Sequence, residues 1–272
     1  MEPANINNMT VLAAGAHPDD IEFRMTGTLL LLKEKGVNIH MWNIASGSCG
    51  SDTHDAETIS KIRWEEACAS AELIGAVMHP PIVGDLEIFH IPPQIAKATA
   101  LIREVKPDII LLPSPQDYME DHENACRLIV TGAFSRGIRN YKSDPPVPPW
   151  MGQTALYHAM PASPRDNLRR RVKAGQYVDI TTVMDKKEAM LACHRSQKEW
   201  LDFSQETDSY IDSMKSMSRV MGEMSGQSDW AEGWRRHNHK GYADPEYDPL
   251  SDILGDLCWT DPTYEVTLDE GM

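Results

Sequence analysis

Short apolar runs alternate with amphipathic segments over residues 9–139. The apolar runs are bounded by Gly, Pro, Asn and Ser, which is typical of buried strands. The segments between them repeat apolar residues every three or four positions, as helices that cover a sheet do. We expect strands at 9–16, 37–46, 76–84 and 107–115, and helices at 21–36, 55–74, 94–106 and 121–138.

This alternation predicts an α/β fold, with a parallel-dominated sheet and helices on both faces. A Pro-rich linker, "SDPPVPPWMG" (143–152), follows the alternating region. Beyond it we expect two more strands and a helix, and after residue 200 an extension of helices and loops packed on the domain. A Met-rich helix in that extension would pack on the domain or on a second subunit. These later segments are 154–160, 176–181, 182–197 and 213–224.

Composition narrows the class of protein. With 272 residues, 41% of them hydrophobic, the chain can bury one large core. The net charge of −15 disfavours nucleic acid and anionic membranes as partners. No apolar run is long enough to span a bilayer, and the first residues lack the basic region of a secretory signal. The five scattered cysteines contain no C-x-x-C and indicate reduced thiols in a cytoplasmic protein.

Two polar loops follow the first and fourth expected strands. In a doubly wound sheet of order 3-2-1-4-5, these two strands are neighbours, and their carboxyl ends flank the point where ligands bind. The first loop carries His17, Asp19 and Asp20. The second is "SPQDYMEDHENA" (114–125) and includes His122. The topology therefore predicts that both loops line one crevice.

The residue types in these loops point to a metal. His17 and Asp20 are three apart on a turn, so both can face one point, and His122 supplies a second imidazole. Two imidazoles and one carboxylate, with a position left for water, form the usual catalytic zinc site. The metal would lower the pKa of its water, and Asp19 could take the proton. The expected reaction is hydrolysis of a polarised carbonyl.

Simpler explanations exist for the same residues. Asp19 and Asp20 could belong to a type I turn that caps the next helix. Asp121 could cap its own helix or hold an imidazole through its second nitrogen. The H-x-H of His237 and His239 lies in a basic stretch that we expect to be solvated. The loop "SGSCGS" (46–51) matches no phosphate-binding fingerprint, so we reject nucleotide binding.

Several separated segments resemble the LmbE/PIG-L superfamily of zinc-dependent N-acetylglucosaminyl deacetylases. They are "AHPDD" (16–20), "IRWEEACASAELIGA" (62–76), "DYMEDH" (117–122) and "KKEAMLACHRSQ" (186–197), and they occur in the family's order. The likeness covers roughly residues 9–200. It implies a Rossmann-like deacetylase domain over 1–200, with 201–272 as the extension.

The resemblance also implies roles for individual residues. Zinc would be held by the residues that match the family ligands, His17, Asp20 and His122, and Asp19 would be the general base. Asp121 would support a ligand imidazole. The family's substrates are N-acyl amino sugars, which adds Arg63, Asp85 and the Ser46 loop as candidate substrate contacts. Arg63 could equally be a surface ion-pair partner of Glu66 or a buried brace, and Asp85 a turn residue.

One position departs from the family. Met119 stands where the family's H-P-D-H begins with a histidine, which stabilises the oxyanion or protonates the leaving amine. A thioether has no acidic proton. Tyr118 and His194 are the preferred candidates to take over that role, and His158 is a third.

The residues predict a metal-dependent hydrolase, and the resemblance implies that it is an N-deacylase for linear amides in an amino sugar or its glycoside. One Zn²⁺ per chain is expected, although another divalent metal could bind the same ligands. Its partner would be a small-molecule amino sugar, and the chain could form a homo-oligomer. The alternatives are an amidase that cleaves a larger amide or thiol conjugate, and a non-catalytic relative that binds metal and carbohydrate.

Overall fold

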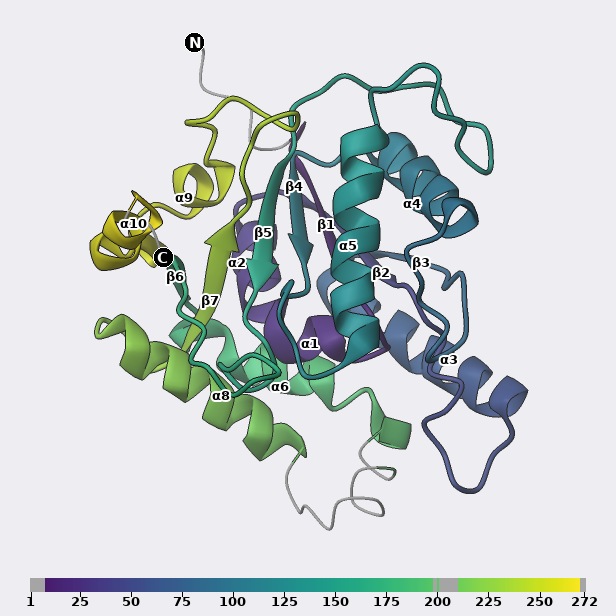
Figure 1. The fold of residues 1–272 in the computed structure, drawn as a ribbon. Helices are drawn as coiled ribbons and strands as arrows, with labels where there is room; N and C mark the ends of the chain where they lie inside the picture. Colours follow the sequence, from purple (N-terminus) through teal and green to yellow (C-terminus); the bar gives the residue numbers. More distant parts are fainter. Residues whose placement is uncertain (1–7, 198–199, 201–209, 270–272) are drawn as a thin grey trace.

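The computed structural model describes residues 8–197, 200 and 210–269. The first seven residues and residues 201–209 of the expected extension lie outside this part. Eight strands form one sheet in the order β3-β2-β1-β4-β5-β7-β6-β8 (Figure 1). The strands are β1 (Thr10–Gly15), β2 (Asn38–Asn43), β3 (Val77–His79), β4 (Ile109–Leu112), β5 (Ala155–Ala159), β6 (Gln176–Asp179), β7 (Ala231–Arg236) and β8 (Cys258–Thr260).

Helices cover both faces of this sheet, as expected from the sequence. The α-helices are α1 (Asp20–Arg24), α2 (Thr26–Glu34), α3 (Ala56–Ile74), α4 (Pro92–Val105), α5 (Glu120–Ser135), α6 (Met184–Leu191), α8 (Tyr210–Ser225), α9 (Pro249–Leu254) and α10 (Pro262–Asp269). Short 3₁₀ turns, η2 (Thr181–Val183) and η3 (Gly255–Leu257), precede α6 and β8.

The first five strands have the predicted 3-2-1-4-5 order and are all parallel. β7 is antiparallel to both of its neighbours, β5 and β6, and β8 is antiparallel to β6. The C-terminal region was expected to hold only helices and loops. It instead supplies two strands of the same sheet, one of them internal.

Strand β1 shows how the two halves of the core are divided. Val11 and Ala13 point to the face covered by α2, while Leu12 and Ala14 point to the face covered by α4 and α5. All four side chains are fully buried. Figure 1 shows α4 and α5 on one side of the sheet and α2 on the other. A strand with both faces covered carries the continuous apolar run seen in the sequence.

The segment 21–36 was expected to be one helix and is two. The chain breaks at Met25, whose φ of −130° is not helical. Asp20 starts α1, so the turn after β1 runs directly into a helix only one and a half turns long. Gly36, predicted to follow the helix end, has φ 91°, a conformation that favours glycine.

The Met-rich helix α8 packs on the domain. Met214 and Met221 are buried, and Met221 belongs to a small core with Ala231 of β7. The apolar stripe is therefore covered within the chain, and a homo-oligomer stays a prediction. Across the described ranges, no helix combines the length and the apolarity that crossing a bilayer requires.

Candidate active site

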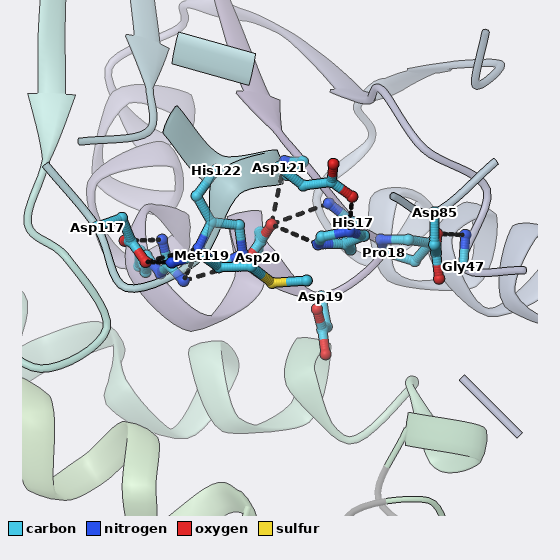
Figure 2. Close-up of polar contacts among 12 residues, drawn as sticks. His17, Pro18, Asp19, Asp20, Gly47, Asp85, Asp117, Met119, Asp121 and His122 are labelled. Atoms are coloured by element: carbon cyan, nitrogen blue, oxygen red, sulfur yellow. Dashed lines mark hydrogen bonds and ion pairs between the residues drawn. The ribbon is translucent and has the colours of Figure 1, made fainter. Parts of the chain in front are cut away.

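The two predicted loops meet at the carboxyl ends of β1 and β4, which are neighbours in the sheet. His17 and Asp20 follow β1, and His122 lies in the first turn of α5. One ligand atom from each of these residues lies within 4.8 Å of the others. Figure 2 shows the three side chains converging. In the part of the chain that the structure describes, this is the only such group of His, Cys, Asp or Glu able to hold a metal ion.

Each imidazole is held on its far side by a carboxylate. The Nε2 atom of His17 lies 2.9 Å from Asp121 Oδ2, and Nδ1 of His122 lies 2.9 Å from Asp117 Oδ1. A proton on each of these nitrogens satisfies both contacts. It leaves a lone pair on His17 Nδ1 and on His122 Nε2, which lie 3.7 and 3.3 Å from the Asp20 carboxylate. This donor set fits a divalent cation such as zinc.

The surroundings of Asp20 stabilise its ionised carboxylate, the form that binds a cation. Its Oδ2 accepts hydrogen bonds from the backbone N–H groups of Ala16 and His17, at 3.0 and 2.9 Å. Burial alone would raise the pKa of Asp20, but His122 and Arg24 outweigh it and hold that pKa well below its usual value. Asp20 therefore stays ionised.

The carboxylates around His17 make its ring basic. Burial lowers the pKa of His17, but the hydrogen bonds to Asp121 and Asp20 overcome this and raise the pKa to about 10. A site that stabilises a proton this strongly has an excess of negative charge. A metal cation would occupy the same favourable potential.

The buried Arg24 balances part of that negative charge. Its guanidinium lies 3.2 Å from Asp20 Oδ1 and 3.3 Å from Asp117 Oδ2. Arg24 was not among the residues predicted from the sequence. The signal was present, because Arg24 follows Asp20 by four positions, the spacing of ion pairs along one helix face.

Asp19 has an uncommon backbone conformation, with φ 106°. Its side chain extends away from the three candidate ligands in Figure 2. Its Oδ2 accepts a hydrogen bond from the hydroxyl of Tyr210 and lies 3.8 Å from a terminal nitrogen of Arg63. Burial is the main cause that raises the pKa of Asp19. A carboxylate with a raised pKa suits a general base at neutral pH.

The capping explanations fail for both loops. Asp19 occupies the N-cap position of α1, but its side chain makes no capping hydrogen bond. The N-cap of α5 is Met119, and Asp121 lies inside the helix. The Asp121 carboxylate instead contacts His17 and accepts the backbone N–H of Leu86 at 2.7 Å.

The residues expected to contact a substrate make structural contacts within the protein. Arg63 is buried and donates to the carbonyl oxygen of Pro18 at 2.9 Å, the geometry of a brace. The two oxygens of Asp85 accept the N–H groups of Gly47 and Cys49, at 2.7 and 3.0 Å. The Ser46 hydroxyl lies 3.0 Å from that of Ser60. Direct binding of a substrate by Arg63, Asp85 or Ser46 stays a prediction.

The expectation for the H-x-H segment is wrong. His239 is buried, and its Nδ1 donates to the carbonyl oxygen of Asp244 at 3.0 Å. His237 bonds to Nε2 of His158 through its own Nδ1 at 2.9 Å. His237 is half-buried, so only part of the segment after β7 is exposed to solvent. Both ring nitrogens of His158 are engaged, Nδ1 by the carbonyl oxygen of Pro113 and Nε2 by His237.

Comparison with known proteins agrees with the fold and the geometry. The family model described as PIG-L, GlcNAc-PI de-N-acetylase, matches residues 12–134, which include all three candidate ligands. Diacetylchitobiose deacetylase from Thermococcus kodakarensis is 26% identical over 238 residues, 83% of this chain and 82% of the relative. Both matches support the LmbE/PIG-L superfamily predicted from the sequence.

Two further proteins widen the comparison. The chain is 25% identical to 4-oxalmesaconate hydratase from Pseudomonas putida over 202 residues, 71% of this chain and 76% of the relative. The crystal structure of N,N'-diacetylchitobiose deacetylase from Pyrococcus horikoshii superposes with a TM-score of 0.72 at 22% identity. That match covers 89% of this chain and 88% of the other. The fold is therefore shared by enzymes with different reactions.

The structure places the two preferred replacements for the histidine missing at Met119 in different surroundings. The Tyr118 side chain is 68% exposed, and its ring meets His122 edge-on at 5.7 Å between centroids. The His194 ring is buried, with Nε2 only 3.2 Å from Glu22 Oε1. Burial lowers the pKa of His194, but Glu22 reverses this and raises it. The catalytic roles of Tyr118 and His194 stay predictions.

Proposed function

We propose that the protein is a metal-dependent hydrolase that removes an acyl group, preferably acetyl, from the nitrogen of an amino sugar or its glycoside. The observation that carries this proposal is the convergence of His17, Asp20 and His122 next to the buried carboxylate of Asp19. The Thermococcus kodakarensis relative is a diacetylchitobiose deacetylase, which supports the substrate class.

His17, Asp20 and His122 would hold the metal. Imidazole and carboxylate ligands together favour zinc, and iron or another divalent ion suits the same donors. A bound cation would act as a Lewis acid toward the acyl oxygen and toward water. Asp117 and Asp121 hold the two imidazoles in the orientation that this binding requires.

Asp19 would carry the proton through the reaction. It accepts a proton from the water that attacks the acyl carbon, and the protonated carboxyl then gives that proton to the amine nitrogen as the C–N bond breaks. One residue can serve both steps because the proton it accepts is the one that the leaving amine needs. This use of Asp19 would reduce the demand for a second acid at position 119.

The charges around the site favour a neutral substrate over a polyanion. Five carboxylates face two guanidinium groups in and beside the cluster. With a divalent cation bound, the surroundings would remain negative, and a substrate with several carboxylates would be repelled. An amino sugar carries no such charge. The residues are Asp19, Asp20, Asp85, Asp117, Asp121, Arg24 and Arg63.

A second candidate is hydration of an unsaturated carboxylate. Met119 is the observation that favours it, because addition of water to a double bond expels no amine and needs no donor for one. The Pseudomonas putida relative is a 4-oxalmesaconate hydratase. The negative surroundings weigh against this candidate, so we place it second.

The test is amine release from N-acetylglucosamine and diacetylchitobiose by zinc-loaded protein. We expect turnover by the wild type and a loss of at least about a hundredfold in Asp19→Ala, the size of a lost general base. Asp256→Ala, at an exposed acid, serves as the matched control and should keep wild-type activity. Release from larger amides measures the amidase alternative.

Two other outcomes would contradict the proposal. Loss of the conjugated absorbance of an unsaturated carboxylate, without amine release, would favour the hydratase. Stoichiometric metal with no turnover of either kind would favour a non-catalytic protein that binds metal and carbohydrate.

A cytoplasmic location is also part of this proposal. All five cysteines of the chain are free thiols. Reduced thiols are typical of the cytosol, where disulfides rarely persist.

A further inference from the structure

A phenol from the C-terminal region contacts the candidate base. The hydroxyl of Tyr210 donates a hydrogen bond to Oδ2 of Asp19, although 191 positions separate the two residues in the sequence. Both side chains are buried, with 8% and 7% of their surface exposed. A buried hydrogen bond to a carboxylate is among the stronger ones in proteins.

Two elements fix the position of this phenol. Tyr210 is the first residue of α8, and Met214 and Met221, one and three turns further along, are buried in the core. The ring also packs on Phe23 of α1, with 5.8 Å between centroids and 36° between planes. Helix α1, which begins at the candidate ligand Asp20, therefore contacts the first residue of α8.

The other polar side chains near Asp19 have different partners. Arg63 donates to Pro18 and only approaches Asp19 at 3.8 Å, and His194 pairs with Glu22. Within the described ranges, the other oxygen of Asp19, Oδ1, has no hydrogen-bond partner. The carboxylate thus has one oxygen held by the protein and one left for a water molecule.

We propose that Tyr210 is a positioning residue that acts through Asp19, so that helix α8 is part of the active site. This inference rests on the proposed hydrolytic function. The terminal torsion of an aspartate is broad and poorly fixed on its own. A hydroxyl on Oδ2, with the Arg63 brace beside it, sets that torsion and presents Oδ1 to the water. The positioning group lies outside residues 12–134, the region that the family model covers.

Tyr210→Phe tests the inference, because it removes only the hydroxyl and keeps the ring against Phe23. We expect kcat for amine release to fall by roughly 10–100-fold, as for loss of other residues that orient a catalytic group, with KM within about twofold of wild type. Tyr242→Phe is the matched control: it removes another buried tyrosine hydroxyl, one that donates to the Val130 carbonyl oxygen. This control should leave kcat unchanged.

A double-mutant cycle with Asp19→Ala separates positioning from a general structural effect. If Tyr210 acts through Asp19, then adding Tyr210→Phe to Asp19→Ala should change kcat by less than about twofold. Equal losses in both backgrounds would overturn the inference, as would a Tyr210→Phe protein with near-wild-type kcat.

Inactivity of the wild type on every amide would instead contradict the proposed function. The pairing of Tyr210 with Asp19 is then measured by thermal unfolding of the wild type, Tyr210→Phe, Asp19→Ala and the double variant. Non-additive changes in Tm would support the pairing, and additive changes would overturn it.

Discussion

At the scale of single residues, His17 and His122 show how a site can be set before any ligand binds. Each ring has a carboxylate on one nitrogen and faces Asp20 with the other. The carboxylates come from a loop and from the start of a helix, so the ring orientations are fixed by the backbone as well as by charge. Binding of a cation should therefore require little rearrangement.

Metal binding should release a proton from His17. The metal-free ring has a pKa of about 10, so at neutral pH it is protonated and must lose that proton to become a ligand. The apparent association constant for zinc should rise about tenfold per pH unit between about pH 7 and 9, and fall as the solution becomes more acidic. Calorimetric titration in buffers of different ionisation enthalpy measures the release. Binding with no proton release would contradict the assignment.

Substitution of Gly47 tests whether Arg63 is held in a fixed position beside Asp19. Its φ is 81°, and a Cβ there would lie 2.5 Å from Cδ of Arg63. Gly226 is a matched control, since its φ is 65° and a Cβ there would meet nothing within 4 Å. Gly226→Ala should cost about 1–2 kcal/mol for backbone strain alone. Gly47→Ala should cost roughly 1–3 kcal/mol more, because Arg63 has to move.

Urea denaturation of both alanine variants gives the comparison. Equal free energies of unfolding for the two would show that Arg63 is free to shift. The kcat of the Gly47→Ala protein is a second measurement. It should fall, because a displaced Arg63 leaves the Asp19 carboxylate less well held.

At the scale of elements, the sequence predicted the six strands β1 to β6 from local signals and missed β7 and β8. β1, β2 and β4 are apolar runs with β-branched residues and a turn residue at each end, and all three form where expected. β7 has no such signal, because "AEGWRR" combines a charge and a glycine at its centre. Its Glu232 is satisfied in the interior by a distant lysine and by two backbone N–H groups of α2. Tertiary contacts of this kind leave no trace in a local pattern.

The ion pair between Lys187 of α6 and Glu232 of β7 should contribute to the free energy of unfolding. Both side chains are buried, and Glu232 also accepts the N–H groups of Gly27 and Thr28 at 2.8 Å each, at the start of α2. Lys187→Met leaves a buried carboxylate without its cation and should cost about 3–5 kcal/mol.

The neighbouring lysine supplies the control for this prediction. Lys186 is exposed and lies 3.4 Å from Glu34. Lys186→Met should change the free energy of unfolding by less than about 1 kcal/mol, because an exposed ion pair is screened by solvent. Chemical denaturation measures the free energy of unfolding of both variants. Similar values for both would contradict a structural role for the buried pair.

At the scale of the whole molecule, residues far apart in the sequence complete one site. The convergence of the three candidate metal ligands was predictable, because topology brings the ends of β1 and β4 together and the spacing within each loop is informative. The pairing of Arg24 with Asp20 was predictable from their spacing of four residues. Tyr210 was not, because a tyrosine at the start of a polar, Met-rich helix has no pattern that links it to residue 19. Only the packing of α8 on the sheet makes that link.

The same packing predicts the behaviour of a shortened chain. A protein that ends at residue 200, the boundary expected from the sequence, would lose β7 from between β5 and β6. We expect such a fragment to show no cooperative unfolding transition by circular dichroism, because two internal strand edges and the core beneath α8 would be open to water. A sharp two-state transition in the fragment would contradict this.

The central place of β7 also constrains how the protein is made. Residues of β5 leave the ribosome well before the strand that pairs with them, and β6 also waits for it. Throughout that interval the nascent chain carries unpaired edges of the kind that associate with other chains. Translation speed and chaperone supply should therefore govern the yield of this protein more than they do for a sheet whose neighbours emerge in succession.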